Sequence, residues 1–402
     1  MKARFYTTRA YEKYLLQQIR GVAERHNMGV DVIDSGAFIV DVKSGAFGVF
    51  DMGGNLVKSS LQWRGNNTNC TPPHGAVMRA DVGFCDCDAV FLGNAYPHFG
   101  HFLIEHLNRA WGMDDCPGDN VKYVFVDNKN IGAKPWLFDF MELLGIRRDD
   151  VLILNQSMRF RRVFIPSQSF NNSGRWWAKQ FVIPFDKMRD NAHVDEVWDK
   201  VYVSRARLPE NMRTYGEEKI QHIFEKNGFH IIYPETLPLA QQVAIIGNAR
   251  VLAGCAGTAL HLALFMKPGG HVIQLNRTNA IKDSGVLQYR MCQMKNLDFD
   301  VVAASVEEFK SQHGGTHAPQ IIGVNENLRA FLDANGFEYT DNDLVMDDGE
   351  LARYRAQVDL FRQSHGGLFI QKLKKLSIKV IACFMPGRIM RGRVRKWLKE
   401  HW

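Results

Sequence analysis

The sequence of 402 residues lacks several features that would place it in a class at once. No run of apolar residues approaches the roughly 18 that span a bilayer, and the N-terminal stretch MKARFYTTRAYEKYLL has no apolar core of a secretory signal. We therefore expect a cytoplasmic protein. The seven cysteines are odd in number and are not spaced like a disulfide framework, which favours unpaired thiols in a reducing compartment.

Two nucleotide-binding fingerprints and a zinc motif are also missing. The chain has neither the Walker pattern of ATPases nor the G-x-G-x-x-G spacing of nicotinamide enzymes, so neither class is supported. Cys85 and Cys87 form a C-x-C pair without a second pair of closely spaced ligands, and a structural zinc site normally needs four. We expect no metal at this pair.

Charge is concentrated at one end of the chain. The net charge is +7, yet residues 366–402, here called the basic tail, hold ten Lys or Arg and one Glu, so the other residues sum to −2. A nucleic-acid-binding protein would carry its basic stripe on the folded domains, so we expect no nucleic-acid partner. The tail mixes apolar and basic residues at helical intervals, which favours a helix on an anionic membrane surface. The alternative is a C-terminal helix that packs back on the folded part with a solvated basic face.

Length and pattern indicate an α/β protein. A chain of 402 residues exceeds what one hydrophobic core usually spans, so we expect two α/β domains with the site between them. Short strands alternate with helices from Ala89 and again from Val201, as in parallel, doubly wound sheets. Strands are predicted over 121–126 and 151–154, and a helix over 217–226. Four regions are predicted: an N-terminal α/β domain over 1–190, a Rossmann-like domain over 191–320, a helical region over 321–365 and the basic tail.

The most regular βα unit contains a glycine turn that suits a phosphate. A predicted strand ends at Ala253, a turn with Gly254 and Gly257 follows, and a predicted helix runs from Thr258 to Met266. Backbone N–H groups at the start of that helix would face the carboxyl edge of the sheet, where phosphates bind. An ordinary βα turn with small residues for close packing is the alternative.

A second segment combines three chemically capable side chains. His101, Glu105 and Arg109 lie four residues apart in a helix predicted from about His98 to Trp111, so they would share one face. Such a stripe can line a cleft, or it can be a solvated face with an ion pair between Glu105 and Arg109.

Two predicted strand ends add further polar groups. Ser204 and Arg205 follow a strand over 201–203, and an arginine there can hold a diphosphate or a carboxylate with two parallel hydrogen bonds. Glu235 follows a strand over 230–233, where a carboxylate can hold ribose hydroxyls or cap the next helix.

Taken in order, these segments resemble glycosyltransferase family 61, in the branch that builds capsular polysaccharide. The similarity extends over about residues 90–278 and depends on the order and spacing of short motifs. The motifs are Gly100-His-Phe-Leu with Glu105 and Arg109, Tyr202-Val-Ser-Arg205, Gly228-Phe, Pro234-Glu235, Gln242-Val, Ala249-Arg-Val251, and Gly257-Thr-Ala-Leu-His261 with Phe265-Met.

The resemblance implies an inverting, metal-independent transferase without a cofactor, and a GT-B-like fold of two Rossmann-like domains that face each other across a cleft. It would move a sugar from a nucleotide-sugar donor to a surface polysaccharide, capsular or related, or to a lipid-linked glycan. The first domain would face the acceptor and the second would bind the donor. Either His101 or Glu105 would be the base, and the residues expected to bind the donor are Arg109, Ser204, Arg205, Glu235, Gly257, Thr258 and His261.

The chain departs from the family pattern at one position of the glycine turn. Many members have a histidine where this chain has Ala256, whereas Gly257-Thr-Ala-Leu-His261 matches a bacterial variant with a later histidine. The variant implies that His261 takes over a polar role, although a histidine in such an apolar helix can also be a satisfied core residue.

Two other hypotheses stay open. The missing histidine at Ala256 suggests a non-catalytic nucleotide- or glycan-binding subunit of a polysaccharide assembly complex. A metal-dependent transferase would need Asp86-Cys-Asp88 as a D-x-D motif, but the chain repeats this pattern at 298–300 and 341–343, which favours chance. In the leading hypothesis the basic tail attaches the protein peripherally to the inner face of the plasma membrane, where a lipid-linked acceptor would lie.

Overall fold

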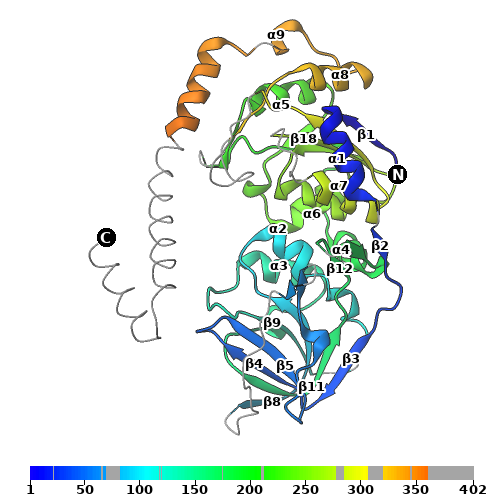
Figure 1. Ribbon diagram of the computed structural model, residues 1–402, viewed down its shortest axis with the longest axis vertical. Helices are drawn as coiled ribbons and strands as arrows, with labels where there is room; N and C mark the ends of the chain where they lie inside the picture. Colours follow the sequence, from blue (N-terminus) through cyan, green and yellow to red (C-terminus); the bar gives the residue numbers. More distant parts are fainter. Residues whose placement is uncertain are drawn as a thin grey trace, which may run out of the picture. The chain divides into compact units, whose positions relative to one another are not determined.

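The computed structural model describes residues 1–360 apart from 21, 65–66, 69–81, 117, 119, 174, 210–211, 278–284, 307–319 and 345. The basic tail lies outside the described residues, so its membrane contact stays a prediction. Figure 1 shows the mixed α/β chain, coloured along the sequence. It divides into two compact units, of which the first comprises Met1–Ser204, Phe224–Asn276 and Ser284–Val302 and the second the remainder.

The first unit contains a six-stranded sheet, as counted over the described part of the chain. Its strands lie in the order β1-β19-β18-β17-β14-β16, and the pairs β1–β19, β17–β18, β14–β17 and β14–β16 are parallel. Its central strands are mostly apolar because both of their faces are buried, although β18 also carries the buried Gln274. The strand bounds are Ala3–Tyr6 (β1), Lys200–Val203 (β14), His230–Ile232 (β16), Val251–Cys255 (β17), His271–Asn276 (β18) and Asp298–Ala303 (β19).

A second sheet of the same unit has seven strands within the described residues. Its strands lie in the order β10-β9-β8-β11-β4-β5, and β3 also pairs with β11. Strands β8, β9, β10 and β11 are parallel to their neighbours among these four. The pairs β11–β3, β11–β4 and β4–β5 are antiparallel. The strand bounds are Val30–Asp34 (β3), Ala37–Asp41 (β4), Ala46–Phe50 (β5), Gly83–Asn94 (β8), Val121–Val126 (β9), Val151–Leu154 (β10) and Met158–Pro166 (β11). The strands predicted over 121–126 and 151–154 are confirmed.

The helices follow the strands closely in sequence. The predicted helix over 217–226 is confirmed, and no helix in the described part of the chain is long and apolar enough to cross a membrane. The bounds are Arg9–Ile19 (α1), Phe99–His101 (α2), Pro135–Leu143 (α3), Ile183–Asn191 (α4), Glu217–Lys226 (α5), Leu239–Asn248 (α6), Gly285–Met294 (α7), Glu326–Ala334 (α8), Asp341–Leu344 (α9) and a helix over 348–360.

The regular helix predicted from His98 to Trp111 is wrong. After α2 the chain forms a π-helical turn over Phe102–His106, in which the Leu107 N–H donates to the Phe102 carbonyl, and later a 3₁₀ turn over Ala110–Gly112. A π-helical turn closes i→i+5 hydrogen bonds and so changes the angular spacing of the side chains. The four-residue spacing still brings His101 beside Glu105 but does not put Arg109 on the same face.

One hydrophobic core joins elements that follow the two sheets of the first unit. The Phe265 ring, in the 3₁₀-helical segment η8 (Thr258–Phe265), stacks on Phe140 of α3 with ring centroids 6.4 Å apart. It also meets Phe185 of α4 edge-on at 5.6 Å. Because all three rings are fully buried, this packing positions η8 against the elements that follow β9.

The second unit is smaller and has its own apolar cluster. Short strands β15 (Thr214–Tyr215) and β20 (Gln320–Ile321) pair in parallel, and their buried side chains pack with Val358. Since both large sheets belong to the first unit, the predicted domain boundaries near residues 190, 320 and 365 and the two-domain GT-B arrangement stay predictions.

One cysteine pair departs from the expectation of unpaired thiols. A disulfide joins Cys85 and Cys87, whose Cα atoms lie 5.4 Å apart in β8. Residues two apart in a strand project from the same face, which brings the two thiols together. Within the described residues, Cys116, Cys255 and Cys292 form no disulfide.

Close approach of β17 to β14 requires glycine at position 254. A Cβ atom placed there would lie 2.5 Å from Val203 Cγ2 and 2.7 Å from the Val203 carbonyl oxygen. We expect Gly254→Ala to lower the free energy of unfolding by about 1–3 kcal/mol, because the backbone of β14 must move. Urea unfolding measures the effect. Gly83→Ala in β8 is the matched control, since nothing lies within 4 Å of its Cβ position, and equal stability of the two variants would contradict the account.

Candidate functional site

The six-stranded sheet has a topological switch point between β14 and β17. From β14 the chain continues to β16 on one side and then crosses to β17 on the other side. Connections that leave in opposite directions open a crevice at the carboxyl ends of such strands, where ligands of open α/β sheets bind. Ser204 follows β14 at this point, and Ala256 and Gly257 follow β17.

The turn after β17 carries the predicted phosphate-binding residues. The Ala256 N–H donates to the Leu275 carbonyl at 2.8 Å, which fixes the start of the turn against β18. Thr258 then begins η8, so the first N–H groups of η8 are directed back toward the strand ends. Gly257 and Thr258 thus lie at the switch point, in the position that the glycine turn predicts.

Helix α2 approaches this turn at Gly100. A Cβ atom at Gly100 would lie only 2.9 Å from Thr258 Cγ2 and 3.4 Å from His261 Cδ2. A side chain at this position would force Thr258 to move, so its absence lets the segment after β8 pack directly on the segment after β17. Residues about 160 positions apart in sequence meet here.

His101, next to this contact, pairs with Glu105. His101 Nδ1 lies 3.1 Å from Glu105 Oε2, and the side chains are 36% and 15% exposed. An ionised carboxylate only accepts hydrogen bonds, so Nδ1 of His101 carries the proton in this pair. Nε2 is then the imidazole nitrogen that can take up a proton.

The π-helical turn holds Glu105 by its main chain. The Glu105 carbonyl accepts hydrogen bonds from Gln62 Nε2 at 2.6 Å and from Asn108 Nδ2 at 2.8 Å. Both side chains help to satisfy the hydrogen-bonding capacity of this carbonyl. The backbone of Glu105 is therefore fixed.

Two further rings surround His101, and the sequence analysis did not select either. The His98 and Tyr96 ring centroids lie 4.9 Å and 5.5 Å from that of His101, and Tyr96 also stacks on His106 at 5.2 Å. His98 is the residue before α2, and its Nδ1 faces the His101 N–H at 3.5 Å. Its sequence signal is its place at the start of a predicted helix.

His261 is held in one tautomer by Gln288 of α7. The Gln288 amide donates to the Leu260 carbonyl at 3.2 Å, which leaves Gln288 Oε1 to accept from His261 Nδ1–H at 3.1 Å. Burial, and after it the nearby His101 and His98, lower the pKa of His261 to about 4, although the Gln288 contact opposes the shift. His261 is therefore neutral at pH 7. Gln288 is a further residue that sequence reasoning missed, because the contact is tertiary.

Arg109 lies apart from this group. Its fully buried guanidinium donates to the carbonyls of Leu61 and Pro166 and stands 5.3 Å from the centre of the Phe91 ring. These contacts tie main-chain segments together, which is a structural role. Its part in donor binding stays a prediction that this geometry does not support.

The other predicted donor residues are placed separately. The buried Ser204 donates its N–H to the Ile232 carbonyl at 2.9 Å, and Glu235 is exposed in a 3₁₀ turn after β16. Arg205 begins the second unit, where its guanidinium donates to the Met212 carbonyl at 2.9 Å and its N–H to Glu217 Oε1 at 3.0 Å. Its contact with a diphosphate stays a prediction.

The D-x-D triplets have other partners. Asp88 is buried and forms ion pairs with both Arg161 and Arg162, and these contacts lower the pKa of its carboxyl group. Asp300 is likewise buried and pairs with Arg4 and His271. In the described residues no group of three or more His, Cys, Asp or Glu side chains is arranged to hold a metal ion.

Residues 99–273 match the family model described as Glycosyltransferase 61. The matched span begins at α2, ends in β18, and so includes His101, Glu105 and the turn at Gly257. A search of the curated proteins found no match. The resemblance to glycosyltransferase family 61 expected from the sequence is thus confirmed over residues 99–273. The match does not show that the chain belongs to the capsular branch of that family.

The low pKa of His261 makes stability depend on pH. The unfolded chain protonates this residue below its ordinary pKa of 6.5, whereas the folded chain does so only near 4. The stability contribution is complete above pH 6.5 and is lost as the pH falls from 6.5 toward 4, by about 2 kcal/mol at pH 4.5. Urea unfolding at pH 7.5 and 4.5 measures this loss. The loss of stability should be smaller by that amount in His261→Gln and unchanged in His26→Gln, which replaces an exposed histidine. Equal losses in the wild type and both variants would contradict the prediction.

Proposed function

We propose that the chain is an inverting, metal-independent glycosyltransferase that moves a sugar from a nucleotide-sugar donor to a glycan acceptor. The Glycosyltransferase 61 match over residues 99–273 supports sugar transfer. The observation that carries the proposal is the contact of Gly100 with Thr258 and His261, because it unites a histidine–carboxylate pair with a switch-point turn.

The donor diphosphate would bind at the turn of Gly257 and Thr258. Backbone N–H groups at the start of η8 can meet negative charge, and Ser204 lies at the adjoining strand end. Arg205 would approach the diphosphate and Glu235 the ribose. Neutral His261 would offer its Nε2 to a hydroxyl of the donor, since Nδ1 is held by Gln288.

His101 would be the general base and Glu105 its positioning partner. The acceptor hydroxyl gives its proton to His101 Nε2 as its oxygen bonds to the anomeric carbon. On the opposite face the bond from that carbon to the phosphate oxygen breaks, and the nucleoside diphosphate leaves with the electron pair. Glu105 stabilises the imidazolium that forms and keeps the ring in place, as a carboxylate does in other histidine pairs.

The acceptor would be a surface polysaccharide, capsular or related, or a lipid-linked glycan. This part of the proposal depends on the basic tail, whose net charge of +9 favours an anionic membrane surface. Peripheral attachment to the inner face of the membrane would bring the site near a lipid-linked acceptor.

The test combines donor identification with variants of the pair. We expect one of UDP, GDP, CMP or dTDP to raise the melting temperature with and without EDTA, and the corresponding sugar nucleotide to be turned over. In that assay His101→Gln and Glu105→Gln should lower kcat by about 10²- to 10⁴-fold, because proton transfer is lost or misdirected, while the donor Kd stays within about twofold.

Glu142→Gln in α3 is the matched control and should retain full activity, since Glu142 is half exposed on the surface beside Arg148. Unchanged kcat in both His101→Gln and Glu105→Gln would remove the pair from the mechanism. Donor binding without hydrolysis or transfer to any acceptor would favour the non-catalytic subunit instead.

A further inference from the structure

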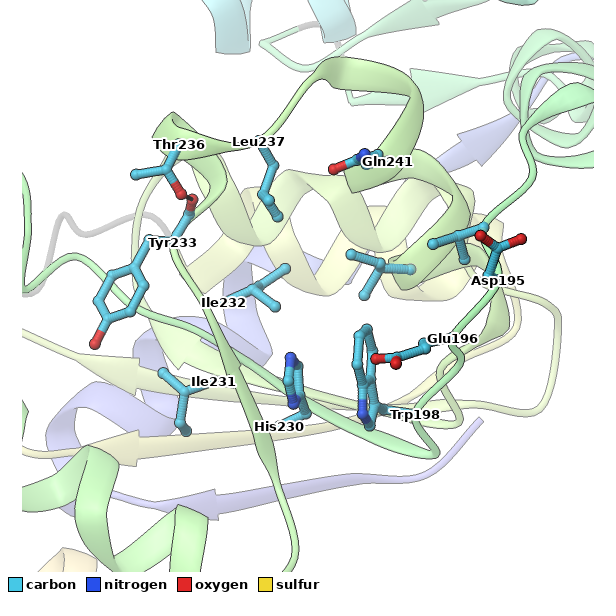
Figure 2. A pocket seen from close by; sticks show the side chains of 12 residues that line it. Asp195, Glu196, Trp198, His230, Ile231, Ile232, Tyr233, Thr236, Leu237 and Gln241 are labelled. Carbon is cyan, nitrogen blue, oxygen red and sulfur yellow. Dashed lines mark hydrogen bonds between the residues drawn. The ribbon is translucent and has the colours of Figure 1, made fainter.

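A separate groove lies along the edge strand of the six-stranded sheet. It encloses about 410 Å³ between β16, α6 and the segment before β14. Figure 2 shows the side chains that line it. None of them belongs to the group around His101 and Thr258, so the groove is a second site of the first unit, and its volume is sufficient for one or two sugar rings.

An aromatic pair forms one wall of this groove. The rings of Trp198 and His230 stack with their centroids 3.6 Å apart and their planes within 4° of parallel. Figure 2 shows them side by side, with Glu196 next to Trp198. Trp198 is only half buried, although it is the largest apolar side chain of the groove. Stacking holds both rings in place, so the surface they present is preorganised.

The other lining residues divide into an apolar floor and a polar rim. Val194, Ile232, Leu237 and Ile245 supply the aliphatic surface. The rim carries two exposed carboxylates, the Gln241 amide and the Thr236 hydroxyl, which donates to the Tyr233 carbonyl at 2.8 Å. The two carboxylates are those of Asp195 and Glu196.

This chemistry restricts the ligand. Ionised carboxylates only accept hydrogen bonds, so a ligand of this rim must present donors. They also repel phosphate groups, which makes a nucleotide the wrong occupant. The aromatic pair and the aliphatic floor require in addition an apolar face. A pyranose ring has such a face of C–H groups and a rim of hydroxyl donors, and C–H groups are attracted by the negative face of an aromatic ring.

We propose that the groove at Trp198 and His230 is a glycan-binding subsite, distinct from the transfer site, that holds a neutral sugar unit. Trp198 contacts the ring of the sugar, and Asp195 and Glu196 accept hydrogen bonds from its hydroxyls. If the chain is a transferase as proposed above, this subsite retains the glycan near the enzyme; the binding itself does not depend on transfer.

The experiment measures binding directly, in the full-length chain labelled with 5-fluorotryptophan. The resonance of Trp198 is assigned by its loss in Trp198→Phe. The probes are β-linked trisaccharides of glucose, galactose, xylose and N-acetylglucosamine, each tested to 50 mM, an upper limit on the order of the weak affinities expected for one sugar subsite. At least one trisaccharide should shift the Trp198 resonance in a saturable way.

Variants then connect the shift to the groove. The double variant Asp195→Asn, Glu196→Gln should raise the Kd at least about threefold and Trp198→Ala, followed on the ligand signals, about tenfold. Val197→Ala is the matched control, because this exposed residue lies between them in sequence but does not line the groove. The carboxylate variants change only exposed side chains, so they test the proposal even if Trp198→Ala does not fold.

Three results would overturn the proposal. The first is that no trisaccharide shifts the Trp198 resonance. The second is a shift with tetramethylammonium in place of the sugars, which would indicate a cation site. The third is a shift with UDP, which would indicate a nucleotide site. Failure of the transfer mechanism gives a different pattern, in which His101→Gln retains activity while trisaccharide binding in the groove is unaffected.

Discussion

The approach of Gly100 to Thr258 and His261 is the contact on which the candidate site depends. A side chain at position 100 would overlap the Thr258 methyl group, so the absence of a Cβ atom lets α2 touch η8. The core behind the contact, where Phe265 packs on Phe140 and Phe185, keeps η8 in position. The proposed base on one segment and the proposed anion-binding turn on the other could act on one substrate only while this contact is kept.

The irregular helix after α2 serves the same arrangement. A regular helix would place Arg109 on one face with His101 and Glu105. The π-helical turn instead leaves Arg109 in the core, where it donates to main-chain carbonyls. Gln62 and Asn108 then satisfy the Glu105 carbonyl. π-helical turns occur frequently at functional sites, where they redirect a side chain. Here the turn separates the proposed catalytic pair, His101 and Glu105, from the buried Arg109.

Sequence patterns predicted the elements that have strong local signals. The strand over 151–154 is an apolar run and the strand over 121–126 is one apart from Lys122, and the turn at Gly257 follows such a run closely. The π-helical turn could not be predicted, because one side chain that donates to its Glu105 carbonyl is that of Gln62, 43 residues away in sequence. Gln288 was missed for the same reason, since only the packing of α7 brings it to His261.

The central claim is that the donor binds where the segment of His101 meets the turn at Gly257, and amide hydrogen exchange tests it most directly. The protein is labelled in deuterated buffer with UDP, GDP, CMP or dTDP, and with none. One nucleotide should slow exchange in two peptides together, the turn over 256–260 and the segment over 98–106, because it binds across their contact. Slowed exchange in only one of these segments, or in neither with any nucleotide, would contradict the account.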